Sequence, residues 1–203
     1  MTRNPAARLV AITASLWGAV APLGCSRGPS TTAPVDGSAA PAAPSADLVL
    51  SLARAEDQRL AKDVTAGAER DHDPAVRRRA ARALARILDA DDTPLLAALS
   101  DDDDEVVAWA AYGLAESCRS HEEAHVRALA ARLASLRSSS RGGGPVDAHL
   151  AVLRGLGRCG GDLAEQTLRA WLRREDAAPA TLEAAALALG DVAARRGSLS
   201  LES

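Results

Sequence analysis

The sequence from 121 to 125, His-Glu-Glu-Ala-His, has the spacing of a zinc-binding helix. On a helix, this pattern places His121 and His125 on one face and makes Glu122 a candidate general base of a hydrolase. The alternative is a surface helix with incidental histidines, because Ser120 and Glu123 form a capping box at a helix start. No third ligand follows within the next eighteen residues. We therefore expect no metal, no cofactor and no catalytic residues here.

Five consecutive acids from Asp101 to Glu105 suggest a cation site. A calcium loop alternates its ligands and contains a glycine, and this run has neither property. Acids are favoured at helix N-termini, where they face the positive end of the dipole. We expect a solvated turn whose carboxylates cap the next helix, with calcium as the alternative.

A pattern that recurs four times indicates which elements position these residues. Its matched leucines are separated by 30, 42 and 33 residues: Leu84, Leu114, Leu156 and Leu189. Repetition at such a period is typical of a stacked-helix solenoid. Asp73-Pro74 and Pro179 are helix start signals, and apolar residues follow them at helical spacing. We predict an all-α solenoid of about four helical-pair repeats over residues 47–203.

Two stretches resemble bacterial HEAT repeats, including those of the phycobilin lyase type. They are D-P-A-V-R-R-R-A-A-R-A-L-A-R-I at 73–87 and P-L-L-A-A-L-S-D-D-D-D-E-V-V-A-W-A-A-Y-G-L at 94–114. The resemblance extends over roughly 47–196 and weakens in the third copy, which lacks the Ala-Ala pair. It implies a helical scaffold whose surface binds another protein.

Two aromatic residues are candidates for that binding surface. Trp109 and Tyr112 fall where the preceding copy has Arg79 and Arg82, outside the apolar stripe. Tryptophan and tyrosine are favoured anchors of protein interfaces. The alternative is that both rings pack on the neighbouring repeat.

Three arginines are further candidates for partner contacts. Arg127, Arg169 and Arg173 belong to the second helices of their repeats. We expect them to line the concave face of the solenoid beside Glu165, which gives that face mixed charge.

Cys118 and Cys159 follow their matched leucines by four and three residues, and so occupy similar places in adjacent repeats. Helix axes in such a stack are about 8–10 Å apart, beyond an easy disulfide reach. We expect two small buried thiols, with a disulfide as the alternative.

The N-terminal region resembles that of a bacterial lipoprotein. Residues 1–24 contain two arginines and then an apolar stretch too short to cross a bilayer, as in a secretory signal peptide. The stretch ends in Leu23-Gly24-Cys25, which resembles a lipobox and implies a lipid on Cys25. Residues 25–46, rich in Pro, Ala and Ser, have the composition of a flexible linker. The resemblance implies a periplasm-facing lipoprotein in the bacterial cell envelope, with the outer membrane favoured by Ser26.

The formal net charge is −3, which disfavours nucleic acid as a partner. Together these features predict a non-catalytic protein–protein interaction scaffold or adaptor, anchored in the envelope, with no small-molecule substrate. Two alternatives remain open. One is a zinc-dependent envelope hydrolase that uses residues 121–125. The other is a fragment of a longer HEAT-repeat protein, because the C-terminal sequence provides no polar capping helix.

Overall fold

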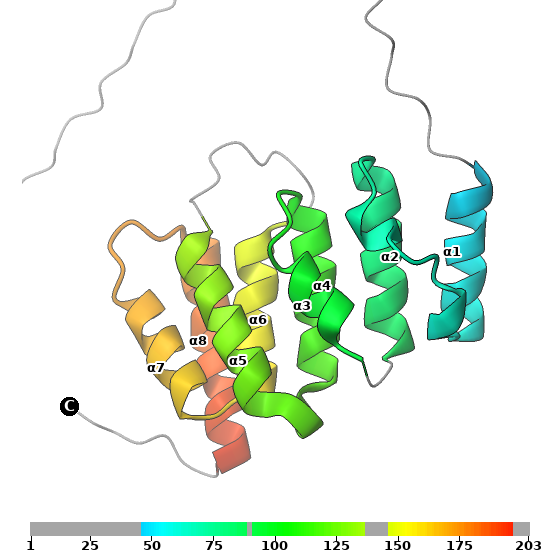
Figure 1. Ribbon diagram of the computed structural model, residues 1–203. Helices are drawn as coiled ribbons and strands as arrows, with labels where there is room; N and C mark the ends of the chain where they lie inside the picture. The colour runs from blue at the N-terminus through cyan, green and yellow to red at the C-terminus, as the bar shows by residue number, and fades with distance from the viewer. Residues whose placement is uncertain (1–45, 89–90, 137–145, 197–203) are drawn as a thin grey trace, which may run out of the picture. The chain divides into compact units, whose positions relative to one another are not determined.

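The computed structural model describes residues 46–88, 91–136 and 146–196, all of which belong to one compact unit. Two short 3-10 helices, η1 (Ala61–Asp63) and η2 (Ala68–Arg70), lie between the first two α-helices. The α-helices are α1 (Ala46–Gln58), α2 (Pro74–Ile87), α3 (Thr93–Ala98), α4 (Asp104–Glu116), α5 (Cys118–Ser135), α6 (Ala148–Cys159), α7 (Asp162–Leu172) and α8 (Pro179–Arg196) (Figure 1).

These helices pack in two layers. In the first layer, α1, α2, α4, α6 and α8 contact one another in that order. In the second, α3 packs on α2 and α4, α5 on α4 and α6, and α7 on α6 and α8 (Figure 1). Between α1 and α2 the two 3-10 helices replace a second-layer helix. The prediction of an all-α, HEAT-like solenoid is confirmed.

Three first-layer helices begin with the same capping device. The Asp73 side chain accepts a hydrogen bond from the backbone N–H of Ala75, and Asp147 accepts one from His149. Asp103 accepts from two backbone N–H groups at the start of α4. Each carboxylate satisfies a donor that the helix itself leaves unpaired. Local sequence therefore determines where the first-layer helices α2, α4 and α6 begin.

Small residues hold the first-layer helices close together. A Cβ atom added to Gly113 of α4 would lie 2.8 Å from the Ala85 Cα of α2. One added to Gly157 of α6 would lie 2.7 Å from the Ala188 Cα of α8. Helix backbones approach this closely only where a side chain is missing. The buried core around these contacts consists mostly of alanine, leucine and valine.

Several predictions fall outside the described residues. They include the signal peptide at 1–24, the lipidation of Cys25 and nearly all of the linker at 25–46. Helix α1 begins at Ala46, one residue before the predicted start of the solenoid. No helix in the described ranges is long and apolar enough to span a bilayer.

Candidate functional site

Trp109 and Tyr112 lie on α4 with their rings in contact. The ring centroids are 6.0 Å apart and the ring planes are nearly perpendicular, at 87°. Trp109 is half-buried and packs against the core, whereas 46% of Tyr112 is exposed. The two rings therefore differ. Trp109 packs on the neighbouring helix, as one of the two alternatives proposed for both rings, whereas Tyr112 faces solvent, where a partner could contact it.

A groove of about 480 Å³ adjoins the two rings, between the C-terminal ends of α1, α2 and α4. We call it the arginine–aromatic groove. Its lining residues are Arg59, Ala85, Arg86, Leu88, Trp109, Tyr112 and Glu116. The Arg82 guanidinium lies over the Trp109 ring, 5.5 Å from its centroid, which is a cation–π contact. The groove therefore combines aromatic surface with positive charge.

A buried carboxylate holds the arginines beside this groove. Glu56 of α1 is buried and contacts three arginines of α2. The N···O distances are 3.1 Å from Arg79, 3.2 Å from Arg82 and 3.0 Å from Arg86. Sequence analysis did not find this cluster. The signal was a glutamate on the apolar stripe of α1, facing arginines at i, i+3 and i+7 of the next helix.

The three other predicted contact residues lie in the second layer, away from this groove. Arg127 of α5 is exposed and pairs with Glu123 one turn earlier. Arg169 of α7 pairs with the buried Glu165 at 2.7 Å. Arg173 is exposed at the end of α7. Of the five predicted partner-binding residues, Trp109 and Tyr112 therefore line the groove and the three arginines do not, and Arg169 takes part in an internal ion pair.

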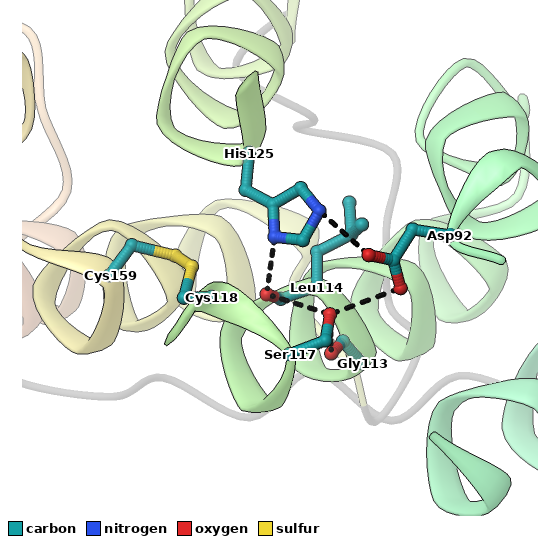
Figure 2. The surroundings of a disulfide bond; sticks show 7 residues. All are labelled: Asp92, Gly113, Leu114, Ser117, Cys118, His125 and Cys159. Carbon is teal, nitrogen blue, oxygen red and sulfur yellow. Dashed lines mark hydrogen bonds and ion pairs between the residues drawn. A yellow bond between two sulfur atoms is a disulfide. The ribbon is translucent and has the colours of Figure 1, made fainter. Parts of the chain in front are cut away.

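His125 is buried, with 1% of the residue exposed, and both of its ring nitrogens have partners. Nε2 lies 3.0 Å from the Asp92 carboxylate and Nδ1 lies 3.0 Å from the Leu114 carbonyl oxygen (Figure 2). Asp92 also accepts a hydrogen bond from the Ser117 hydroxyl. Neither ring nitrogen faces an open coordination position. His125 thus joins α5 to α4 and to the start of α3.

The zinc motif finds no support in this arrangement. The side chains of His121 and Glu122 lie outside the described part of the structure. Among the described residues, no group of three or more histidine, cysteine or acidic side chains could hold a metal ion. The predicted capping box is wrong, because α5 already begins at Cys118 and Ser120 lies inside it. The interpretation of His125 as an incidental surface histidine is also wrong.

Cys118 and Cys159 form a disulfide bond, which corrects the expectation of two free thiols (Figure 2). Their Cα atoms are 5.3 Å apart, within the usual range for a disulfide. The argument from helix-axis spacing failed because both cysteines lie at helix ends, where α5 starts and α6 stops. In addition, α4 and α6 pack closely, since a Cβ on Gly155 would lie 3.3 Å from the Ala111 carbonyl oxygen.

The acidic run binds arginines of α2. Arg77 donates to both carboxylate oxygens of Asp101, at 2.8 and 3.0 Å, and to Asp102 at 2.8 Å. Arg78 donates to Asp103 at 2.9 Å. This hydrogen bond holds the pKa of Asp103 below its ordinary value. The prediction that an acid caps α4 is confirmed, but the turn is not simply solvated, because Asp101, Asp102 and Asp103 pair with two arginines of α2.

The comparison with protein families fits the repeat geometry. Residues 45–115 match the family model for HEAT repeats. The matched segment runs from α1 almost to the end of α4, and therefore includes both rings of the arginine–aromatic groove. HEAT repeats are generally protein-interaction scaffolds and are usually non-catalytic. No curated protein matches the chain.

Proposed function

We propose that the chain is a non-catalytic scaffold that binds another protein through the α4 surface carrying Trp109 and Tyr112. The observation that carries this proposal is the exposed Tyr112 ring, held edge-on by Trp109 beside a groove whose lining residues, except Glu116, belong to the HEAT-matched segment. Rigid aromatic rings next to a concavity are typical anchors of protein interfaces.

We further propose that the scaffold is held at the bacterial cell envelope by a lipid on Cys25. The order of charges, apolar stretch and small residues at 1–24 supports export, and the composition of 25–46 supports a spacer. The disulfide between Cys118 and Cys159 adds independent support, because disulfides persist in oxidising compartments such as the periplasm. Outer-membrane placement rests on Ser26 alone.

In-cell crosslinking of the full chain, followed by pull-down, tests the scaffold. Tyr112→Ala is the informative variant because its ring is exposed and its loss leaves the core intact. Leu187→Ala is a matched control, since this α8 side chain is 65% exposed and lies far along the helix row. We expect a defined partner that the wild type and Leu187→Ala both capture and Tyr112→Ala loses.

Two results would count against the proposal. Equal capture by Tyr112→Ala would remove the aromatic surface from the interface but retain the scaffold. Absence of any crosslinked partner would refute the scaffold itself. Intact-mass analysis of membrane-extracted protein tests the anchor: the wild type should carry a lipid-sized mass increase that Cys25→Ser lacks.

A further inference from the structure

We infer that the arginine–aromatic groove binds an acidic segment of a partner protein, one with an apolar side chain next to its carboxylates. This inference rests on the proposed scaffold function and names the chemical class of the partner. Three properties of the groove lead to it: an excess of positive charge, exposed apolar surface, and unusual backbone at two of its lining residues.

The charge argument begins with the imbalance around Glu56. One buried carboxylate faces Arg79, Arg82 and Arg86, and each guanidinium directs one nitrogen at it. A guanidinium has five N–H donors and the Arg86 side chain is 50% exposed, so Arg86 retains donors that a ligand can reach. Arg59 adds a further exposed guanidinium with no partner among the described residues. The groove is therefore positively charged.

The acids near the groove do not cancel this charge. Glu116 lines the groove, but its carboxylate pairs with Arg158 of α6 at 2.7 Å. Asp57 and Asp91 are exposed nearby in the sequence but do not line the groove. A ligand that supplies carboxylates would meet guanidinium groups able to form paired, charge-assisted hydrogen bonds.

The apolar surface explains why the ligand needs more than charge. Leu88 is 42% exposed at the end of α2, and it lies in the groove with the Tyr112 ring and the Ala85 methyl group. An apolar ligand side chain placed between them would remove this surface from water. Arginine, tryptophan and tyrosine are also the residues most enriched among interface hot spots.

The backbone of the groove is strained. Among the described residues, two non-glycine residues have a left-handed backbone, Arg59 with φ 53° and Leu88 with φ 56°. Both line the groove. Each follows the end of a helix, where glycine is the usual residue because it adopts this conformation without steric cost. Arg59 and Leu88 instead place a guanidinium and an isobutyl group at the groove.

The same surface is a poor fit for nucleic acid. A nucleic-acid site follows a phosphate backbone with an extended basic track. Here the arginines at the start of α2, Arg77 and Arg78, are paired with Asp101 and Asp103, and the whole chain has a net charge of −3. A short acidic peptide matches the extent of the positive charge.

Purified full chain in mild detergent, probed with a synthetic peptide array, tests this inference. The array alternates Asp or Glu with Leu, Trp or Ala, and each peptide has a partner in which Asn and Gln replace the acids. We expect retention of acidic peptides with a large apolar residue over their neutral partners. Peptides that bind are then measured by fluorescence anisotropy at low and high salt, and binding should weaken as salt screens the charges.

Arg59→Gly is the decisive variant. It removes one guanidinium and replaces a strained residue with glycine, so the fold should be retained. We expect about tenfold weaker peptide binding, the loss of one charge-assisted contact. Arg154→Ala is the matched control, because Arg154 is an exposed arginine on α6 outside the groove, and it should bind as the wild type does.

Three results would overturn the inference: no acidic peptide retained above its neutral partner, equal binding by Arg59→Gly, or single-stranded RNA bound more tightly than the peptides. Failure of the scaffold would be seen differently. If Tyr112-dependent capture of a cellular partner persists in Arg59→Gly and peptides do not bind, only the assignment of an acidic ligand is wrong. If no partner is captured at all, the scaffold itself is wrong.

Discussion

The disulfide between Cys118 and Cys159 makes a quantitative prediction about stability. The bridge joins residues 41 positions apart in the sequence. In the chain-entropy account, closing a loop of this length removes about 13 cal/mol/K from the unfolded ensemble. At 25 °C this entropy corresponds to about 4 kcal/mol of stabilisation of the folded state. Loss of the bridge in a Cys118→Ala/Cys159→Ala variant should therefore lower the free energy of unfolding by up to about that amount.

The native structure should survive this change. Both cysteines are buried, and alanine removes only a sulfur atom from each. The corner between α4 and α5 keeps the hydrogen bonds of His125 to Leu114 and Asp92 (Figure 2). For a chain of this size, about 4 kcal/mol corresponds to a decrease in Tm of roughly 8–16 °C. The variant should therefore remain folded at room temperature.

Urea denaturation of the full chain, followed by circular dichroism, measures the effect. Oxidised wild type should unfold at the highest urea concentration, and reduced wild type should match the double-alanine variant. The bridged unfolded state is more compact, so oxidised protein should also show a smaller m-value. Of the three cysteines, only Cys25 should react as a free thiol in oxidised, unlipidated, denatured protein. Equal midpoints with and without reductant, or three reactive thiols, would refute the reasoning.

Three further predictions concern the packing and the ion pairs. Gly157→Ala should destabilise the fold by about 1–3 kcal/mol, because the new methyl group meets the α8 backbone. Gly190→Ala, in an open part of α8, should stabilise the fold by about 0.5–1 kcal/mol, so the urea midpoints of the two variants should move in opposite directions. Glu56→Gln should cost about 2 kcal/mol in the same assay, less than a fully buried ion pair, because its arginines are partly exposed. Arg78 lowers the pKa of Asp103, so the stabilisation from this carboxylate is complete above its unfolded-state pKa near 4 and is lost as the pH falls further. In Asp103→Asn, the free energy of unfolding should therefore depend less on pH below about 4, and the same pH dependence as in the wild type would contradict this.

The sequence was sufficient for the fold because its strongest signals are local. Asp73 with Pro74 marks the start of α2, and Pro179 marks the start of α8. The apolar stripes that follow have helical spacing, and stacking is the way such helices bury them. Each signal acts within one or two turns of helix. The recurrence of this pattern along the chain then predicts that the helices stack as repeated pairs.

The errors concern contacts that depend on how helix ends meet in space. The disulfide was judged from an average distance between helix axes, which does not apply to Cys118 and Cys159 at the ends of α5 and α6. His125 was judged from its place near a helix start, but α5 begins earlier and turns the ring into the core. Sequence spacing gives the face of a helix on which a residue lies, and not what the next helix places against that face.

The candidate site was predicted only in part, because its remaining contacts also depend on how neighbouring helices meet. Alignment of the repeats placed Trp109 and Tyr112 on the face that carries Arg79 and Arg82 in the preceding copy, and the structure puts Arg82 over Trp109. The role of Glu56 was missed. It required three arginines of another helix to converge on one carboxylate, and the sequence shows the arginines but not their convergence.

A charge pattern along the first layer connects the fold to the groove. Matched positions in α1, α2, α4 and α6 alternate in sign: Glu56, Arg86, Glu116 and Arg158. The structure pairs the first with the second at 3.0 Å and the third with the fourth at 2.7 Å. These ion pairs favour packing of each helix on its correct neighbour. If a helix packed on the next first-layer helix but one, the two matched charges would have the same sign. Arg86 and Glu116 both line the arginine–aromatic groove, and each is paired with a residue of another helix, Glu56 of α1 and Arg158 of α6. The groove therefore lies where the pairing along the row is interrupted, and the repeat that interrupts it is the one carrying Trp109 and Tyr112 in place of arginines.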